Sequence, residues 1–401
     1  MTRYDIIIIG GGPAGISAAI YGARARLKTL IINKGTIGGL AYTTREIVNY
    51  PGYENTTGPQ LMEDFKKHAA NLGAEFLNDE VVEVSFAQEE KIIKTKKGKE
   101  FSAKAVIIAC GTNPRLLNIP GEERLRGSGV AYCATCDAEF FEDEDVVVIG
   151  NSDQAIEEGL YITKFAQTVT VIVLHDEGKL DCNKLSAEKA FKNEKMRFVW
   201  NSTIQEVLGD TNVEGIHIKN LKTEEISHLS CQGVFFFVGM IPATDFLKDS
   251  GLMMDQRGYL LVNELMETNI EGVYAVGDNR VKYLKQIVSA AGDGATAAVA
   301  AERYLEELND FKENVLENQG PVILSFFNPL VEESLAFNSA LEKAAGGSHK
   351  IFKVDISRKK ILAERYGIKE VPAAVVINEG KFIGQLDCSL DQEKLKSQIV
   401  R

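Results

Sequence analysis

The sequence lacks any long, uninterrupted hydrophobic run. Its two most apolar stretches, DIIIIGGGPAG and GVFFFVGMIPA, are short and contain glycine and proline, so neither could span a bilayer. The first begins at Asp5 and leads into a glycine loop, without the apolar region and cleavage site of a signal peptide. These absences predict a cytoplasmic protein with no membrane partner.

Blocks of basic residues are missing as well. The net charge is -12 and no Lys/Arg-rich segment occurs, which argues against nucleic acid or an anionic membrane as the main partner. What is present is 401 residues of ordinary globular composition. This length exceeds what one hydrophobic core usually supports, so we expect two or three domains.

Paired cysteine motifs are nearly absent. Of the six cysteines, only Cys133 and Cys136 are close enough in sequence to act together. The others stand singly: Cys110, Cys182, Cys231 and Cys388. A structural zinc site commonly draws four ligands from two paired motifs, and no second CxxC or CxxH occurs, so we predict no metal site.

The Cys133–Cys136 pair therefore favours redox chemistry. A structural disulfide closing so small a loop in the cytoplasm would contribute little and would tend to be reduced. At a helix start, the helix dipole stabilises a thiolate, and the CxxC spacing lets the two sulfurs meet. Asp137 follows directly, and because disulfide reduction consumes protons, its carboxyl is a candidate proton donor. A helix N-cap is the alternative role for Asp137, compatible with the first.

A glycine loop follows the first expected strand, Asp5–Ile9. The loop is GGGPAG, and it leads through a helix of small residues to a second strand ending near Asn33. Loop glycines permit a tight turn and close approach to a pyrophosphate, and the helix N-terminus favours the phosphate charge. This order of elements predicts a dinucleotide site. Asn33 stands where an acidic residue usually holds the ribose, and would be a weaker, neutral anchor.

A second strand-loop-helix-strand unit spans EDVVVIGNSDQAIEEGLYITKFAQTVTVIVLHDEGK. Strands are expected over Val146–Ile149 and Val169–Leu174, but the loop is altered: Ser152 replaces the middle glycine and Asp153 adds a negative charge. No arginine follows the second strand to bind a 2′-phosphate. Two interpretations of this unit stay open: an inherited fold that binds a nicotinamide nucleotide poorly or not at all, and a working NADH site. NADPH is the least favoured nucleotide.

The two units lie ~140 residues apart, which predicts one domain inserted into another. The chain returns to the first domain with a strand over Val273–Val276, followed by Asp278 and a long alanine-rich helix. Asp278 is placed to accept hydrogen bonds from a ribityl chain, or alternatively to cap the helix.

Over residues 1 to 310 these motifs resemble the low-molecular-weight thioredoxin reductases. The motifs are the GGGPAG loop, Gly38-Gly39 followed by TTREIVNYPGY, IIACGTNPRLLNIPGE, YCATCD, FFFVGMIP, and VYAVGD followed by Lys285-Gln286. The resemblance implies two Rossmann-like domains, one for FAD and one for NADPH, the redox cysteines in the inserted domain, and a homodimer. It further implies that Cys136 faces the flavin and that Cys133 attacks the external disulfide.

The resemblance also implies a set of FAD contacts. These are Gly10, Gly12, Pro13, Ala14, Gly15, Asn33, Gly38, Gly39, Leu40, Asn49, Val82, Gly111, Asp278, Lys285 and Gln286. Leu40 stands where the family usually has Gln, and Lys285 where it has Arg, so some flavin contacts are altered. The altered second loop is similar to that of ferredoxin-dependent flavin thioredoxin reductases and other branches that dispense with NADPH. The electron donor stays open between NADH, NADPH and reduced ferredoxin.

From about residue 318 the chain resembles thioredoxin. Its most specific segment is LAERYGIKEVPAAVVINEGK, in which Val371-Pro372 matches the cis-proline position of that family; an edge-strand proline is the alternative. Where thioredoxin carries CxxC, this chain has Phe327-Asn328-Pro329-Leu330-Val331. We therefore expect this domain to bind rather than to react.

Together these features predict an α/β protein with two Rossmann-like, three-layer nucleotide-binding domains, one inserted in the other, plus a thioredoxin-like domain. The FAD-binding domain comprises residues 1–114 and 243–311, the inserted NAD(P)-type domain with the CxxC comprises 115–242, and the thioredoxin-like domain comprises 318–401. The predicted activity is reduction of thioredoxin or a similar protein disulfide through FAD and the cysteine pair. The rival hypothesis is a redox-sensing flavoprotein scaffold that recruits partners through its thioredoxin-like domain.

Overall fold

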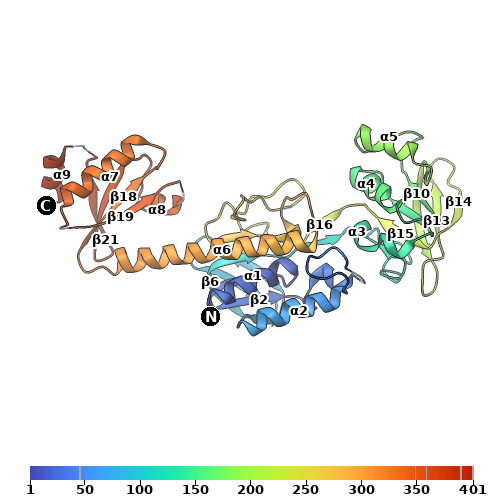
Figure 1. The fold of residues 1–401 in the computed structure, drawn as a ribbon, viewed down its shortest axis with the longest axis horizontal. Coiled ribbons are helices and arrows are strands. Elements are labelled where there is room, and N and C mark those ends of the chain that lie inside the picture. The colour runs from blue at the N-terminus through green and yellow to red at the C-terminus, as the bar shows by residue number, and fades with distance from the viewer. Residues whose placement is uncertain (45–46, 348, 358, 389–390, 400–401) are drawn as a thin grey trace. The chain divides into compact units, whose positions relative to one another are not determined.

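The protein is described by a computed structural model that covers residues 1–44, 47–347, 349–357, 359–388 and 391–399. Arg45 and Glu46 of the TTREIVNYPGY motif lie outside the described residues. The chain forms two compact units, Met1–Ala301 and Glu302–Arg401 (Figure 1). In the described ranges, no helix combines the length and apolarity needed to cross a membrane.

The first sheet contains seven strands in the order β3-β2-β1-β6-β5-β4, with β17 paired to the second half of β6. β3, β2, β1, β6 and β17 are parallel to one another, whereas β5 pairs antiparallel with both β6 and β4. The strands are β1 (Thr2–Ile9), β2 (Thr29–Asn33), β3 (Glu75–Asn78), β4 (Val81–Ser85), β5 (Lys91–Thr95), β6 (Glu100–Ile108) and β17 (Val273–Ala275). Ile6 to Ile9 are all buried, as expected for a parallel strand covered on both faces.

Helices α1 (Pro13–Arg24), α2 (Gly58–Asn71) and α6 (Ile287–Phe311) accompany this sheet (Figure 1). α1 and α6 approach each other closely, since a Cβ added at Gly294 would lie 2.0 Å from the carbonyl oxygen of Ala14. The Ser17 hydroxyl donates a hydrogen bond to the Ala291 carbonyl at 2.7 Å in the same contact. This packing places the start of α6 beside the glycine loop that opens α1.

A two-stranded antiparallel ribbon separates the first sheet from the next along the chain. β7 (Thr112–Pro114) follows β6, and β16 (Met240–Pro242) pairs with it, with Pro114 opposite Met240. The chain thus leaves the first sheet and returns to it through adjacent strands. The insertion boundaries at 114 and 243 stay a prediction, which this pairing supports.

The second sheet is parallel throughout, in the order β11-β10-β9-β15-β8. Its strands are β8 (Val130–Ala131), β9 (Asp145–Ile149), β10 (Thr168–Ile172), β11 (Met196–Val199) and β15 (Gly233–Phe236), and its helical segments are α3 (Ala134–Asp137), η2 (Ala138–Phe141), α4 (Asp153–Ile162) and α5 (Lys184–Lys192). Val146 and Val148 pack into one core with residues of these helices. β10 ends at Ile172, two residues before the predicted end.

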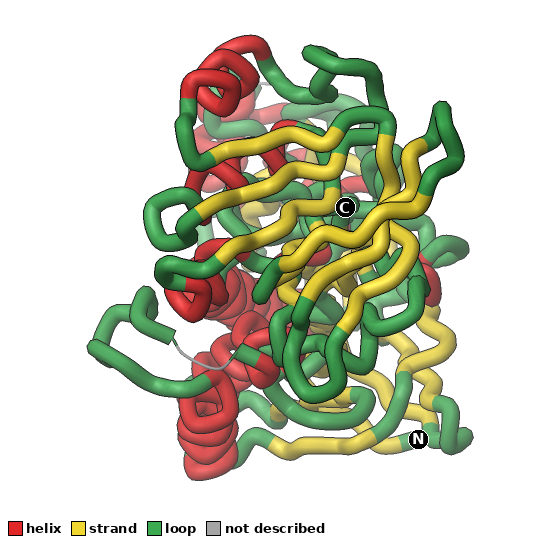
Figure 2. Tube along the Cα trace, turned by 90° about the vertical axis from the view of Figure 1, so that its right-hand side faces the viewer, coloured by secondary structure: helices red, strands yellow, loops and turns green. Residues whose placement is uncertain are grey.

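The opposite face of the second sheet carries a third layer that the sequence analysis missed. This layer is an antiparallel sheet of β12 (Ser202–Leu208), β13 (Gly215–Asn220) and β14 (Ile226–Ser230). Val147 and Ile149, which alternate with the valines of the first core, pack against Ile204 and Ile216 here. Figure 2 views the molecule from this side, with strands in yellow and helices in red. The three-layer arrangement is therefore confirmed, with a sheet as one outer layer.

The second unit has a four-stranded sheet in the order β19-β18-β20-β21. Its elements are η5 (Lys312–Leu316), β18 (Pro321–Phe327), α7 (Glu332–Ala345), β19 (Lys350–Asp355), α8 (Lys360–Arg365), β20 (Ala373–Asn378), β21 (Lys381–Leu386) and α9 (Gln392–Ile399). Its core reaches back to Phe311 and Val315, ahead of the predicted start at residue 318. The Val371–Pro372 bond is cis, as predicted.

Candidate functional site

The first glycine loop connects β1 to α1 at the carboxyl edge of the first sheet. Gly10 has φ +108°, and a Cβ there would lie 2.3 Å from the Ala109 carbonyl oxygen. A Cβ at Gly15 would lie 1.9 Å from the Gly10 carbonyl oxygen, so the helix can pack onto the strand only with glycine at this position. Pro13 occupies the first turn of α1, where its missing N–H costs no hydrogen bond.

The middle of this loop faces open space. A Cβ at Gly12 would find only the Gly38 carbonyl oxygen, at 4.0 Å, and Gly39 lies across from it, with its ideal Cβ 3.5 Å from the Gly12 Cα. Gly38 donates its N–H to the Gly11 carbonyl at 2.7 Å, which holds the two glycine segments together. Leu40 follows in η1 (Gly39–Thr43) with 37% of its surface exposed. Because glycines line both sides of this space, no side chain separates a bound group from the backbone.

Asn33 holds the loop rather than projecting from it. Its side-chain oxygen accepts the Gly11 N–H at 2.8 Å. Its amide nitrogen donates to the carbonyls of Lys34, Gly35 and Thr36 at 3.1 to 3.3 Å. Both ends of the amide are thus used within the protein, and the predicted ribose contact of Asn33 stays a prediction.

Asp278 lies directly after β17, in η4 (Gly277–Asn279), and its Oδ1 is buried with no hydrogen-bond partner among the described residues. Burial raises the pKa of this carboxyl, against the opposing charges of Lys282 and Lys285. A buried acceptor without a partner is costly unless a ligand supplies a donor. Asp278 is therefore suited to bind hydroxyl groups of a ligand.

A buried ion-pair cluster fixes the segment around Asp278. Asp293 on α6 accepts hydrogen bonds from the Gly277 N–H at 3.0 Å, from Arg280 at 2.7 and 2.9 Å, and from Lys282 at 2.8 Å. Although burial opposes it, the hydrogen bonds and charges of Arg280 and Lys282 lower the pKa of Asp293. The cluster ties the end of β17 to α6 and so orients Asp278.

The remaining predicted flavin residues are distributed around this edge with one exception. Gly111 follows β6 with φ +65° and no atom within 4 Å of an ideal Cβ. The Lys285 ammonium lies 3.9 Å from the centre of the Tyr259 ring, a cation–π contact. Val82 is the exception, since it lies on the edge strand β4 with an exposed side chain.

The predicted redox pair is a disulfide between Cys133 and Cys136 at the start of α3. Cys133 is the N-cap residue of α3, and Asp137 ends the helix, with its N–H bonded to the Cys133 carbonyl at 3.2 Å. Both cysteines are partly exposed, so the pair is accessible. The helix-start position that the sequence predicted is confirmed.

Thr135, which lies between the cysteines, connects the pair to two predicted flavin residues. Its hydroxyl is 3.5 Å from the Cys133 sulfur and accepts a hydrogen bond from the Gln286 amide at 2.9 Å. The Gln286 oxygen in turn accepts from Asn49 at 3.3 Å. Asn49 and Gln286 therefore bring the redox turn to the start of α6, a role that the sequence analysis missed because only tertiary contacts reveal it.

The sequence analysis also missed two carboxyls in the inserted domain, Glu122, which is buried, and Glu158, which is partly buried. Glu122 is 1% exposed and accepts hydrogen bonds from the Tyr132 hydroxyl at 3.0 Å and the Leu117 N–H at 3.2 Å. Glu158 lies on α4 (Asp153–Ile162), and burial raises the pKa of its carboxyl. Glu158 could have been found from helical spacing, since it falls on the apolar face of its helix.

The second loop repeats the fold of the first, but its polar groups are used internally. Asp153 accepts hydrogen bonds from the Asn183 N–H at 2.6 Å and from the Asn183 amide at 2.8 Å. Asp181 accepts from Asn151 at 3.2 Å and contacts His175 at 2.8 Å, and the hydrogen bond with His175 lowers the pKa of Asp181. Segment 175–183 is thus bonded to the loop where a pyrophosphate would approach.

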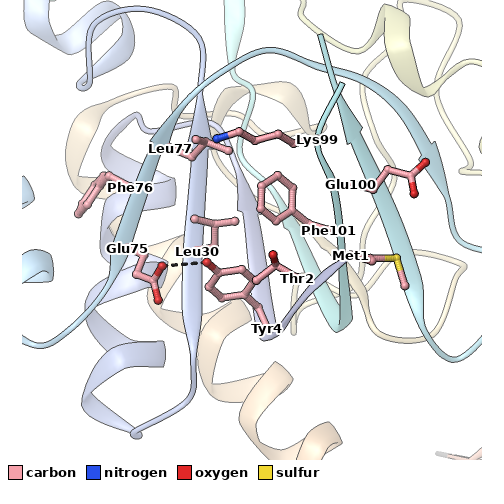
Figure 3. A pocket seen from close by; sticks show the side chains of 10 residues that line it. All are labelled: Met1, Thr2, Tyr4, Leu30, Glu75, Phe76, Leu77, Lys99, Glu100 and Phe101. Atoms are coloured by element: carbon pink, nitrogen blue, oxygen red, sulfur yellow. Dashed lines mark hydrogen bonds between the residues drawn. The ribbon is translucent and has the colours of Figure 1, made fainter. Parts of the chain in front are cut away.

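A pocket of about 420 Å³ lies at the opposite edge of the first sheet, where β1, β2, β3 and β6 begin (Figure 3). In the wall of this pocket, the Tyr4 hydroxyl donates a hydrogen bond to Glu75 at 2.8 Å. Burial, and to a lesser extent this hydrogen bond, raises the pKa of Tyr4 to about 12. Parallel α/β sheets bind ligands at the carboxyl ends of their strands, so this pocket is at the wrong edge for a dinucleotide. Within the described ranges, no cluster of three or more His, Cys, Asp or Glu could hold a metal ion.

The thioredoxin-like unit has no cysteine where thioredoxin carries its pair. Its β18 is followed by Asn328, which accepts the Leu330 N–H at 3.0 Å, and Leu330 is 90% exposed. Cys388, the one cysteine of this unit, lies after β21, and burial raises the pKa of its thiol. Dithiol chemistry by this unit alone is excluded.

Comparison with known proteins defines the class first. Residues 4–294 match the pyridine nucleotide-disulphide oxidoreductase family, and residues 304–401 match the thioredoxin family. The chain therefore joins an oxidoreductase of the first family to a thioredoxin-like domain.

The relatives define the branch. The chain is 47% identical over 312 residues to a thioredoxin reductase of Peptoclostridium litorale, covering 76% of this chain and 98% of that protein. It is 41% identical over 315 residues to a bifunctional thioredoxin reductase/thioredoxin of Mycobacterium leprae, and the match covers 78% of this chain and 68% of that protein. A thioredoxin reductase structure from Streptococcus pyogenes matches with a TM-score of 0.71 at 39% identity, and the match covers 76% of this chain and 99% of that one. The chain belongs to the low-molecular-weight thioredoxin reductase family.

Proposed function

We propose that this protein reduces the disulfide of thioredoxin, or of a similar protein, with FAD as its internal electron carrier. The observation that carries the proposal is the partly exposed Cys133–Cys136 disulfide, joined through Thr135 and Gln286 to the site at the start of α6. The thioredoxin reductase relatives support the substrate class.

The first-loop site fits FAD. The open glycine loop at the N-terminus of α1 suits a pyrophosphate, and the unpartnered Oδ1 of Asp278 suits the hydroxyls of a ribityl chain. When bound, FAD supplies two electrons at a time to the disulfide. The glycines of both segments, with Pro13, Ala14 and Asp278, would hold it, and a homodimer stays a prediction from the resemblance.

The cysteines perform the exchange. Reduction of the pair breaks the S–S bond, consumes two electrons and two protons, and leaves two thiols, with Asp137 as the proposed proton donor. The Cys133 thiolate then attacks one sulfur of the substrate disulfide, forming a mixed disulfide and releasing the other substrate sulfur as a thiolate. The Cys136 thiolate attacks Cys133, which re-forms the protein disulfide and frees the reduced substrate.

The second part of the proposal concerns the electron donor. We propose that the altered second loop is not an efficient entry for NADPH, because Asp153 and Asp181 place two carboxylates at the loop. Carboxylates beside a helix N-terminus repel the phosphates of a dinucleotide. NADH and reduced ferredoxin stay as the other donors to be compared.

A redox-sensing scaffold is the second candidate, favoured by the thioredoxin-like unit without a cysteine pair. Multiple turnovers of oxidised thioredoxin, with excess reduced donor, distinguish the two. We expect turnover in the parent chain and a loss of at least about 10³-fold in Cys136→Ser, because the second thiolate is required to release substrate. Flavin content should be unchanged in the variant. Reduction limited to one equivalent per chain would instead favour the scaffold.

A further inference from the structure

Asn279 lies directly after Asp278, at the end of η4, and it is fully buried. Its amide nitrogen donates hydrogen bonds to the Ile108 carbonyl at 3.1 Å and to the Cys110 sulfur at 3.3 Å. Its side-chain oxygen is buried and has no hydrogen-bond partner in the part of the chain that the structure describes. Towards these residues the side chain therefore serves as a donor.

The first of these hydrogen bonds joins the ends of two strands. The pairing of β17 with β6 ends at Ala275, opposite Ile108. The Ile108 carbonyl then accepts the Val276 N–H at 2.9 Å, and the Asn279 amide is a second donor to the same oxygen. A carbonyl oxygen has two lone pairs and can accept both hydrogen bonds. The Asn279 side chain thus attaches the chain after β17 to β6, past the end of the strand pairing.

The second hydrogen bond holds the chain that leaves β6. Cys110 follows β6 and precedes Gly111, which has φ +65° and no atom within 4 Å of an ideal Cβ. Burial raises the pKa of the Cys110 thiol to about 12, so the sulfur stays a neutral thiol and a weak acceptor at neutral pH. One amide therefore holds both the end of β6 and the residue before a predicted flavin contact.

Asp278 is held from both sides as a result. On one side, Gly277 donates its N–H to Asp293 on α6 at 3.0 Å, and it packs against α1, since an ideal Cβ would lie 3.0 Å from the Ala14 Cβ. On the other side, Asn279 is tied to β6. The unpartnered Oδ1 of Asp278 thus belongs to a backbone that is fixed to different elements. A fixed acceptor loses less conformational freedom than a mobile one when a ligand binds.

We propose that Asn279 is a positioning residue that raises the affinity for FAD by tying the backbone of Asp278 to the end of β6. The effect concerns the FAD site alone, so it does not depend on the substrate disulfide or on the electron donor. A direct contact of the Asn279 oxygen with the cofactor is the alternative, and a double-mutant cycle separates the two.

The cycle measures FAD affinity by fluorescence titration of the flavin-free full chain. Asn279→Leu keeps the number and branching of the side-chain atoms and removes the donor, so we expect FAD binding to weaken roughly 3- to 10-fold. Asp278→Ala removes the acceptor that is held in place and should weaken binding at least about tenfold. In the Asp278→Ala background, Asn279→Leu should weaken binding less than about twofold, because no acceptor remains to be positioned.

Asn338→Leu is the matched control. It makes the same change at a buried asparagine of the second unit, whose side-chain oxygen accepts a hydrogen bond from Ser325 at 2.5 Å. Its FAD affinity should coincide with that of the parent, and a loss as large as that of Asn279→Leu would show general destabilisation and overturn the proposal.

Two further outcomes overturn the proposal. One is an unchanged affinity of Asn279→Leu, and the other is an equal loss in the parent and Asp278→Ala backgrounds, which a direct contact of Asn279 with FAD would give. If Asn279→Leu does not fold, Asn279→Ala, which also removes the donor, decides in the same cycle. Because the titration needs neither electron donor nor substrate, a coupled loss of affinity without thioredoxin turnover would refute the proposed function and leave this inference intact.

Discussion

The two glycine loops of this chain share a backbone but differ in chemistry. Gly10 and Gly150 both have positive φ, +108° and +126°, and a Cβ at either would lie within 2.6 Å of a carbonyl oxygen. Two residues further on, the first loop has Gly12, which faces open space, and the second has Ser152, followed by Asp153. The first loop is suited to a phosphate, whereas the second bonds to its own chain.

This difference separates what the fold requires from what the ligand requires. The first glycine of each loop is needed because the strand-to-helix turn brings backbone against backbone. Later loop positions are free to change once no phosphate must be bound, and a polar side chain there can join a hydrogen-bond network instead. A retained turn glycine is therefore evidence of the fold and not of the nucleotide.

The largest expected effect comes from the last position of each loop, Gly15 in the first and Ala155 in the second. We expect Gly15→Ala to lower flavin content at least about tenfold, because its Cβ would lie 1.9 Å from the Gly10 carbonyl oxygen and displace the loop. The matched change Ala155→Gly should retain flavin and cost only about 1 kcal/mol of stability. Flavin absorbance per mole of purified protein checks both, and full flavin content in Gly15→Ala would contradict the requirement.

Asp278 has no acidic counterpart after the equivalent strand β15, where Val238-Gly239 occurs. We expect Asp278→Asn to weaken FAD binding about tenfold, since a neutral acceptor replaces a charged one. Fluorescence titration of flavin-free protein with FAD measures this loss. Unchanged affinity would show that Asp278 does not contact FAD.

The same variant has a predicted pH dependence. Because burial raises the pKa of Asp278, its contribution to the stability of the flavin-free protein is present below the unfolded pKa of about 4 and is lost as pH rises through the folded value. Asp278→Asn should therefore melt at a higher temperature than the parent at pH 7, and the difference should shrink as the pH falls towards 4. A lower melting temperature at pH 7 would contradict the sign.

The smallest effect concerns the second loop. We expect NADPH to bleach the flavin of the parent slowly under anaerobic conditions, and Asp153→Ala/Asp181→Ala to speed bleaching by NADH or NADPH about 3- to 10-fold, because two repelling charges are removed. Asp176→Ala is the control, since this carboxylate lies in the same segment but bonds to Lys222. Rapid bleaching of the parent by NADPH would show that the second loop works despite its altered residues.

Some of this site could be predicted from residues alone and some could not. The strand Ile6–Ile9, the glycine loop, and Cys133 at a helix start follow from local pattern, since apolar runs, glycines and CxxC spacing each restrict nearby backbone. The position of Asn33 at a strand end was predicted correctly. Its side-chain amide, however, forms a hydrogen bond with the glycine loop, and a position at a strand end does not reveal this bond. The hairpin layer of β12 to β14 was missed because its burial depends on a sheet distant in sequence.

By itself, the sequence determined that this protein carries one intact phosphate loop, one altered loop, one redox pair and a thioredoxin-like domain without cysteines. Those features depend on residue type at fixed spacing. Only the tertiary structure decided which polar groups are already satisfied: Asp153 and Asp181 bond within the chain, whereas Oδ1 of Asp278 has no hydrogen-bond partner among the residues that the structure describes. The physical reason is that burial and hydrogen-bond partners are set by segments far apart in the chain, and these set the free energy of each charge.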